Sequence, residues 1–390
     1  MPEPDARPSV TANRGEHRAS MLRVLHVILM LGETNSQYNE QCLPLIGQRD
    51  LSICTYFVPR LTPPPEIALY AGDGTLRGFF RGLNRALSAG TYDVIHVHAP
   101  QTGVFVPLGV LARRHPGRLL RSLVYTVHDS FYDYRPRDQA MMLVPLAVFD
   151  RVVFCSRSAY ESLPRALRWL VGRRWRLVQN GADTDRVDRA VAAAPHARAD
   201  GRFTVISVGR LESVKDPIAL LEAFVRAFGQ DGDARLVFIG AGKLEETLQA
   251  RTEHLGLRDR VDLTGLIPRD DVFVSYAQAD VFVSTSRGEG LPVAVLEAMA
   301  AGCPVILSDI PPHREVAEDA EFIPFVAPGD LEGFAREIRR YEEMPPEERL
   351  AIGRRCRAHV LERFTLPIMH ATTEVVYRGS GRRVRAGRTP

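Results

Sequence analysis

The sequence predicts an α/β protein made of two doubly wound domains in tandem, each a parallel sheet covered by helices on both faces. Three observations support this prediction. The chain has 390 residues, which is too long for one ordinary core. Short runs of Val, Ile and Leu alternate with helical patterns in both halves, as buried parallel strands do. An Ala/Asp/Arg-rich stretch without a strand pattern, 182–202, separates the two sets of runs.

The apolar runs define the expected strands. In the first half they are 22–31, 93–97, 123–127, 150–154 and 176–179. In the second half they are 203–208, 235–239, 261–264, 280–284 and 304–307. Ligands of doubly wound folds bind outside the carboxyl ends of the strands. We therefore expect the functional residues in the turns that follow these strands, facing a crevice between the domains.

The same patterns give the domain boundaries. We expect the following order: a disordered tail at 1–20, the first domain at 21–181, a linker at 182–202, the second domain at 203–365, a helix at 366–378 that crosses back to the first domain, and a basic tail at 379–390. The C-terminal tail is Gly/Arg-rich, which is typical of a disordered segment.

The charge of the chain is uneven. Residues 1–180 carry 22 arginines and 14 acidic residues, a net of +8, and the remainder carries 28 basic and 33 acidic residues, a net of −5, which together give +3. A basic first half indicates an anionic partner such as a lipid headgroup, a phosphate or nucleic acid. A solvated Arg-rich surface explains the same charge equally well.

Composition and hydropathy indicate a cytoplasmic protein that does not span a membrane. The five cysteines are scattered and form no C-x-x-C pair, so neither a disulfide framework nor a zinc site is indicated. The apolar run 21–31 is too short for a membrane span. Segment 165–176 holds five arginines and both tryptophans, and such a segment can lie on an anionic membrane surface. The alternative is a basic surface helix whose tryptophans pack on the domain.

Two cations follow the strand at 203–208. Arg210 stands at its carboxyl end and Lys215 near the start of the next helix. Each can donate a charge-assisted hydrogen bond to a phosphate oxygen, so the pair suits a diphosphate. Lys215 is one of only two lysines among fifty basic residues, which hints that a compact ammonium is required there.

A Gly-Glu-Gly loop at 288–290 precedes Pro292 and the next helix, after the strand at 280–284. Loop amides and the helix terminus together form an anion-binding site. Glu289 and Glu297 are eight residues apart, a spacing that lets one carboxylate hold a sugar hydroxyl and the other a ribose hydroxyl. Two glutamates at this spacing are common by chance, so the spacing supports a sugar site only in combination with the other segments.

The combination resembles family 4 of the glycosyltransferases, which have the GT-B fold of two Rossmann-like domains. Its segments are G-R-L-x-x-x-K-D at 209–216, I-G-A-G at 239–242, T-G-L at 264–266 and S-x-G-E-G-x-P-x-x-x-x-E-A-M-A-x-G at 286–302. The resemblance extends over about 22–377. It implies that Arg210, Lys215 and Gly32 approach the donor diphosphate, Glu289 the transferred sugar and Glu297 the ribose. The other implied donor contacts are the amides of Gly290 and Leu291 and the nucleobase border at Leu266 and Ile267.

In the first half, Gly32 is followed by Glu33 instead of the family's second glycine, a departure that leaves Glu33 available to an acceptor. Val127-His128-Asp129 resembles the family's active-site histidine, which contacts the donor sugar. His98 also ends a strand and is a weaker candidate, whereas His96 is expected to be a packed residue.

Asp183-Thr184-Asp185 matches the D-x-D pattern of metal-dependent transferases by letters alone. We expect no metal and no cofactor, because Arg210, Lys215 and the helix terminus already neutralise a leaving diphosphate.

The sequence therefore predicts a transferase that moves a sugar from a UDP- or GDP-sugar to a hydroxyl of a glycan, lipid-linked or small-molecule acceptor, with no nucleic acid as partner. The resemblance implies that the reaction is retaining. A sugar- or sucrose-phosphate synthase is a subclass of this hypothesis. A sugar-nucleotide epimerase and a non-catalytic anion-binding or nucleic-acid-binding protein remain as alternatives. The sequence leaves the sugar, the base and the acceptor open.

Overall fold

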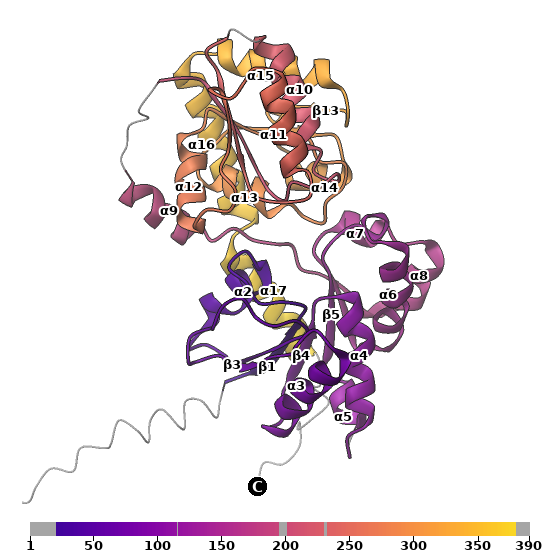
Figure 1. Ribbon diagram of the computed structural model, residues 1–390. Coiled ribbons are helices and arrows are strands. Elements are labelled where there is room, and N and C mark those ends of the chain that lie inside the picture. The colour runs from indigo at the N-terminus through magenta and orange to yellow at the C-terminus, as the bar shows by residue number, and fades with distance from the viewer. Residues whose placement is uncertain (1–20, 115, 195–200, 230–231, 380–390) are drawn as a thin grey trace, which may run out of the picture.

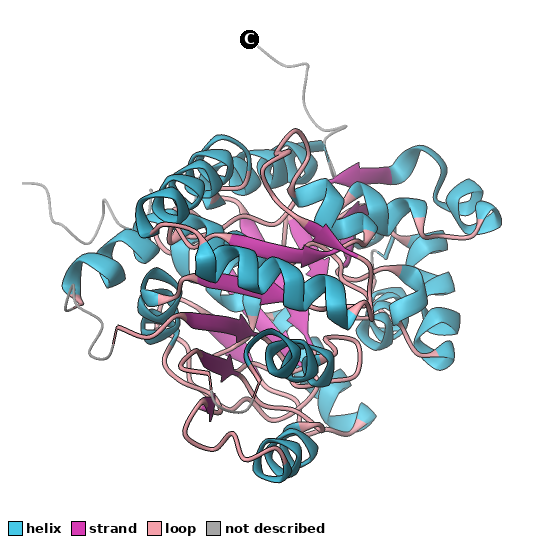
Figure 2. Cartoon of the chain, turned by 90° about the horizontal axis from the view of Figure 1, so that it is seen from above, coloured by secondary structure: helices cyan, strands magenta, loops and turns pink. Residues whose placement is uncertain are grey.

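The computed structural model describes residues 21–114, 116–194, 201–229 and 232–379, and the predicted tails at 1–20 and 380–390 lie outside this range. Two α/β units are visible in Figure 1, each with its own sheet. In both sheets of the described chain, every pair of hydrogen-bonded neighbouring strands is parallel. Figure 2 shows helices on both faces of the strands. The predicted fold class is confirmed.

The first sheet has the order β3-β2-β1-β4-β5-β6-β7. Its strands are β1 Arg23–Ile28, β2 Asp50–Thr55, β3 Ala68–Tyr70, β4 Val94–Val97, β5 Leu123–Val127, β6 Arg151–Phe154 and β7 Trp175–Leu177. The second sheet has the order β10-β9-β8-β11-β12-β13. Its strands are β8 Thr204–Val208, β9 Arg235–Ile239, β10 Val261–Leu263, β11 Val281–Ser284, β12 Val305–Ser308 and β13 Phe325–Val326.

The helices of the first unit connect its strands. They are α2 Ser36–Gln41, α3 Leu76–Ser88, α4 Pro100–Leu111, α5 Pro116–Leu120, α6 Pro136–Val148, α7 Arg157–Glu161 and α8 Arg165–Val171, with 3-10 turns at Leu43–Leu45, Phe131–Asp133 and Gly172–Arg174. Those that follow β7 are α9 Thr184–Ala193, α10 Pro217–Phe228, α11 Glu245–His254, α12 Arg269–Gln278, α13 Val293–Ala300, α14 Pro311–Val316, α15 Leu331–Glu343, α16 Pro346–Arg363 and α17 Leu366–Gly379.

Each sheet has a point where its strand order reverses. In the first sheet it lies between β1 and β4, and in the second between β8 and β11. The loops after these strands diverge there and leave room for a ligand. The predicted site segments 209–216 and 286–292 follow β8 and β11, so they flank the reversal point of the second sheet.

Some elements differ from the sequence-based expectation. Strands β2, β3 and β13 were not predicted, because β2 and β3 carry polar or small residues within the run and β13 has only two residues. Within the predicted linker, residues 184–193 form helix α9 and not an irregular segment. The side chain of Asp183 caps this helix, and the buried Val187 anchors it where α9 packs on α12 and α13.

Helix α17 leaves the second unit and packs on the first sheet, as its label in Figure 1 shows. Its buried Leu366, Met369 and Val376 join the apolar core formed by residues of β1 and β2. Arg49 also pairs with Glu374 at 3.0 Å. The C-terminal helix therefore ties the two units together through apolar burial and one part-buried ion pair.

Candidate active site

Lys215 and Glu289 form a close ion pair at the carboxyl ends of the second sheet. Lys215 Nζ donates to both carboxylate oxygens of Glu289, at 2.5 and 2.6 Å. The turn that carries Lys215 is held by the Thr285 hydroxyl, which donates to the carbonyls of Lys215 and Asp216 at 3.1 and 2.9 Å. Asp216 has a φ of 50°, a left-handed conformation that this turn imposes on a non-glycine residue. The loops after β8 and β11 are therefore fastened to each other.

A buried polar network lies behind Glu289. The Ser286 hydroxyl donates to Glu289 Oε1 at 2.7 Å, and Ser286 Oγ is 3.1 Å from Ser284 Oγ, which is 3.4 Å from His313 Nε2. Burial raises the pKa of Glu289, but the charge of Lys215 and the hydrogen bonds from Lys215 and Ser286 outweigh it, so that pKa lies below its usual value. Glu289 is thus an oriented, ionised carboxylate.

A cavity of about 240 Å³ opens beside this pair, between the two units. Both lysines of the chain line it, together with the exposed Arg210, which forms no ion pair with any residue that the structure describes. From the first unit, Asp129 and Arg135 contribute to the wall. Four cations and four carboxylates line this cavity, and two of the cations are paired, Lys215 with Glu289 and Lys243 with Glu212. Of the four described cations, Arg210 and Arg135 remain to bind an anion such as a diphosphate at the carboxyl ends of the two sheets.

The Gly-Glu-Gly loop touches the first unit directly. A Cβ added at Gly290 would lie 1.7 Å from the carbonyl oxygen of His128, so only glycine permits this approach. The Ser130 hydroxyl donates to the carbonyl of Glu289 at 2.8 Å, and Asn180 Nδ2 donates to the carbonyl of Leu291 at 2.8 Å. These contacts place His128 next to the loop that carries Glu289.

Glu297 lies on α13, buried and paired with Arg269. Burial raises the pKa of Glu297, and Arg269 opposes this shift only in part. Arg269 also reaches across the crevice to Glu40 of α2, with Nη2 3.3 Å from Oε1. Leu266 is exposed and Ile267 half-buried in the turn that precedes α12. The predicted ribose and nucleobase residues therefore lie near each other, with Glu297 held by Arg269.

Glu40 gives the fold a pH dependence. Burial raises its pKa to about 8, although Arg269 opposes this. Because this folded-state pKa exceeds that of the unfolded chain, the contribution of Glu40 is complete below pH ~4.3 and is lost as the pH rises through about 8. In this window the free energy of unfolding of the wild type should fall by up to ~1.4 kcal/mol per pH unit, and Glu40→Gln should lack this fall. Urea unfolding of both proteins at pH 5 and pH 8 measures it, and an equal difference at both pH values would contradict the assignment.

His128 follows β5 and is half-buried. Its Nε2 lies 3.0 Å from Nδ1 of His98 and 3.4 Å from Nε2 of Gln37. His96 is buried and bonded to Tyr377 and Thr126, away from the crevice. Gly32 precedes α2 and does not line the cavity, and a Cβ at this position would meet open space. The structure therefore gives Gly32 no steric reason to be glycine.

The D-x-D segment at 183–185 has a structural function. The carboxylate of Asp183 accepts from the amide of Arg186 at 3.0 Å and caps α9, and Asp185 is exposed in the first turn. Among the described residues, the group with metal-ligand spacing is His26, His96 and His98, not these carboxylates. The absence of a metal requirement stays a prediction.

The two tryptophans of the Arg/Trp segment at 165–176 differ in how they pack. Trp175 stacks on Tyr160 with ring centroids 4.4 Å apart, whereas Trp169 on α8 is 84% exposed. No helix in the described part of the chain combines the length and the apolar character that crossing a bilayer requires.

Sequence reasoning missed several residues of this site. Ser286, Gln37 and Arg269 contact the predicted Glu289, His128 and Glu297, respectively, only after folding. His313 and Glu40 lie one contact further out, against Ser284 and Arg269. Ser286 alone had a local signal, because it stands three residues before Glu289 in the same loop.

Two family models match successive parts of the chain. The model described as Glycosyltransferase Family 4 matches residues 39–186, and the model described as Glycosyl transferases group 1 matches residues 188–359. The chain belongs to family 4 of the glycosyltransferases. It is a glycosyltransferase with the GT-B fold, as the sequence predicted.

Two curated relatives of this glycosyltransferase have names that include a sugar linked to a polyprenol or undecaprenol diphosphate. It is 35% identical to the GDP-mannose:cellobiosyl-diphosphopolyprenol alpha-mannosyltransferase of Xanthomonas campestris, over 58% of this chain and 59% of the relative. It is 27% identical to the UDP-Gal:alpha-D-GlcNAc-diphosphoundecaprenol alpha-1,3-galactosyltransferase of Escherichia coli, over 68% and 69%.

A solved structure shows the same fold over nearly the whole chain. The sucrose-phosphate synthase of Thermosynechococcus elongatus superposes with a TM-score of 0.75 at 20% identity and covers 92% of this chain and 98% of its own. At this identity the likeness concerns the fold.

Proposed function

We propose that this glycosyltransferase takes a sugar from a UDP- or GDP-sugar and transfers it with retention of the α configuration to a hydroxyl of a lipid-linked glycan. The observation that carries the proposal is the cavity at the carboxyl ends of both sheets, with Arg210 and Lys215 at its wall and Glu289 beside them. Cations at this place neutralise a diphosphate, and an ionised carboxylate accepts hydrogen bonds from sugar hydroxyls.

The donor site is completed by the neighbouring loop and helix. In the proposal the amides of Gly290 and Leu291 contact the phosphates, Leu266 and Ile267 border the base, and Glu297 accepts from the ribose. Because Arg269 holds Glu297, the ribose hydroxyls must bind beside or replace this guanidinium. His128 contacts the transferred sugar across the crevice, next to Gly290.

The proposed reaction needs no protein nucleophile. The bond between the anomeric carbon and the phosphate oxygen breaks while the acceptor hydroxyl attacks from the same face, and the departing phosphate takes the acceptor proton. Arg210 and Lys215 stabilise the charge that develops on the phosphate. The short contacts between the units exclude water, which would otherwise hydrolyse the donor.

Slow donor hydrolysis tests the stereochemistry without a known acceptor. We expect proton NMR to show the α anomer as the first sugar released, before mutarotation. The β anomer would contradict retention, and an epimerised nucleotide sugar would favour the epimerase alternative.

A lipid-linked acceptor is supported by the outer surface of the first unit. Helices α4, α6 and α8 are neighbours in Figure 1, and each exposes apolar side chains. The exposed side chains are Leu108, Leu111, Leu143, Val148 and Trp169. Residues 94–128 carry four arginines and no acidic residue. Basic and apolar groups together suit an anionic membrane surface, where diphosphate-linked lipids are found.

We expect the protein to bind vesicles that contain an anionic phospholipid and not purely zwitterionic ones. Trp169→Ala should weaken this binding about tenfold, the equivalent of ~1.4 kcal/mol for one apolar anchor. The matched control is Trp175→Phe, because Trp175 stacks on Tyr160. Vesicle co-sedimentation measures both, and equal binding by the wild type and Trp169→Ala would count against this surface.

A further inference from the structure

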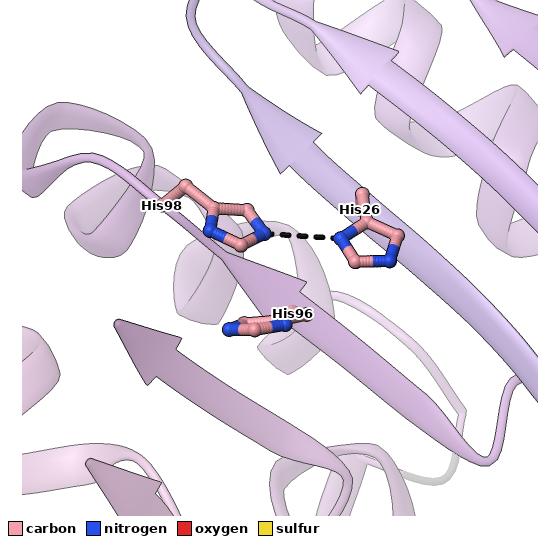
Figure 3. Close-up of side chains that lie close together, drawn as sticks. All are labelled: His26, His96 and His98. Carbon is pink, nitrogen blue, oxygen red and sulfur yellow. Dashed lines mark hydrogen bonds between the residues drawn. The ribbon is translucent and has the colours of Figure 1, made fainter. Parts of the chain in front are cut away.

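Three histidine rings form a hydrogen-bonded series from the core of the first sheet to His128, which is not itself in the cavity wall but adjoins Asp129, which is. His26 on β1 and His98 after β4 are buried, and His26 Nδ1 lies 3.0 Å from His98 Nε2, the contact drawn in Figure 3. His98 Nδ1 lies 3.0 Å from His128 Nε2. The planes of successive rings are tilted by only 13° and 28°, and the ring centroids are 5.3 Å apart in both pairs, so the rings lie edge to edge along the hydrogen bonds. Each ring is therefore held in its orientation by the hydrogen bond to the next ring.

The three rings are neutral at physiological pH. Burial lowers the pKa of His26 to about 3 and that of His128 to about 4, and burial with the neighbouring histidines lowers the pKa of His98 well below its usual value. A neutral imidazole carries one N–H and one bare nitrogen. In a series of such rings all the protons point the same way, either toward the crevice or toward the core.

Two contacts at the ends of the series select the direction. His26 Nε2 is buried without a hydrogen-bond partner, and an unpaired acceptor is tolerated there better than an unpaired N–H. At the other end the amide nitrogen of Gln37, a donor, lies 3.4 Å from His128 Nε2, a long contact that adds to the preference for an accepting nitrogen but is weaker than the 3.0 Å contact from His98. Both contacts place the proton of each ring on Nδ1. No described residue bonds Nδ1 of His128, which leaves this N–H for a ligand oxygen.

We propose that His98 and His26 are positioning residues that hold His128 in the Nδ1–H tautomer, so that it presents a hydrogen-bond donor to the sugar or phosphate of the bound nucleotide sugar. This role rests on the proposed function of His128 in the donor site. A fixed tautomer matters because a bare nitrogen in the same place would repel a phosphate oxygen and could only accept from a sugar hydroxyl, not donate to it.

A metal site is the competing explanation for the cluster. Ring nitrogens of His26, His96 and His98 lie within 4.8 Å of one another. However, both nitrogens of His96 are occupied, by Tyr377 and Thr126 at 2.6 Å each. The group of ligand atoms includes no carboxylate to balance a dication in the core. His96 is therefore a matched control, because it is as buried as His26 and His98 but lies outside the series of hydrogen-bonded histidines.

Nitrogen NMR of the full chain with ¹⁵N-histidine, recorded without donor, reads each tautomer directly. We expect His26, His98 and His128 all as Nδ1–H, whereas free imidazole favours Nε2–H. His98→Leu should return His128 to Nε2–H, and His98→Asn, whose amide occupies the place of Nδ1, should preserve it. His26→Leu should also release His128, two rings away. His96→Asn should leave all three unchanged, whereas a metal site would require His96 equally and would show binding of added Zn²⁺ in calorimetry.

Donor hydrolysis supplies the second readout. His98→Leu should lower kcat about 10²-fold, as a misplaced contact group does, with KM for the donor changed less than twofold. His98→Asn should recover most of this loss. If His128 of the wild type were found as Nε2–H, the proposed positioning role of His98 and His26 would be overturned, whereas the proposed donor site would remain. The expected tautomers combined with wild-type kinetics in both His98→Leu and His128→Ala would overturn the role of His128 itself.

Discussion

Lys215→Met is expected to lower the rate of sugar transfer and of donor hydrolysis by about 10²–10³-fold, the usual effect of removing one group that stabilises developing oxyanion charge. The ammonium of Lys215 contacts both oxygens of Glu289 and lines the polar cavity, so its loss removes a cation from the leaving diphosphate. Glu289→Gln should have a loss of similar size, because an amide accepts weaker hydrogen bonds from sugar hydroxyls. Steady-state rates with a nucleotide sugar measure both.

Measurements of stability distinguish this loss of activity from misfolding of the variant. Lys215→Met leaves the carboxylate of Glu289 buried without its cation, at a cost of about 3 kcal/mol. The double variant Lys215→Met/Glu289→Gln removes both charges, so it should recover most of that stability and none of the activity. Activity near the wild-type level in either single variant would be incompatible with the proposed site.

Gly290→Ala is expected to affect both activity and stability. Its Cβ would lie 1.7 Å from the carbonyl oxygen of His128, so the loop and the first unit would have to separate. We expect a loss of about 1–3 kcal/mol in the free energy of unfolding from overpacking. We also expect a loss of about 10²-fold in donor hydrolysis, because Glu289 and His128 would move apart.

Gly117→Ala is the control for this substitution, because a Cβ at Gly117 meets nothing within 4 Å. Thermal unfolding and hydrolysis rates of the two variants should differ clearly. If Gly290→Ala matched Gly117→Ala in both, the two units would not need this close contact, and the crevice as described would be wrong.

The features that the sequence could predict are those encoded locally. Arg210 and Lys215 follow a continuous apolar run, and Glu289 stands in a Gly-rich loop between a strand and a helix, so strand–turn–helix patterns sufficed to place them at one edge of a sheet. Strand β13 is too short for a pattern. Helix α9 has a capping residue, Asp183, but its apolar face is defined by packing on α12 and α13.

The residues that prediction missed act across long distances in the chain. Arg269 contacts both Glu297 and Glu40, and Glu40 is 229 positions away from Arg269 in the sequence. No local pattern marks either carboxylate as a partner of Arg269. His26 occupies an ordinary position in an apolar strand, and only the pairing of β1 with β4 brings it to His98. Such polar contacts depend on sheet order and domain juxtaposition, which a single sequence does not encode in any short pattern.

The most direct test of the central claim is binding of the donor. Thermal unfolding of the wild type and of Lys215→Met should be measured with UDP-, GDP- and ADP-sugars in turn. We expect one nucleotide class to stabilise the wild type, by about 2.7 kcal/mol at a ligand concentration one hundred times Kd, and Lys215→Met to lose this shift. If no nucleotide sugar stabilised the wild type, or if Lys215→Met were stabilised equally, the cavity beside Lys215 and Glu289 would not be the donor site.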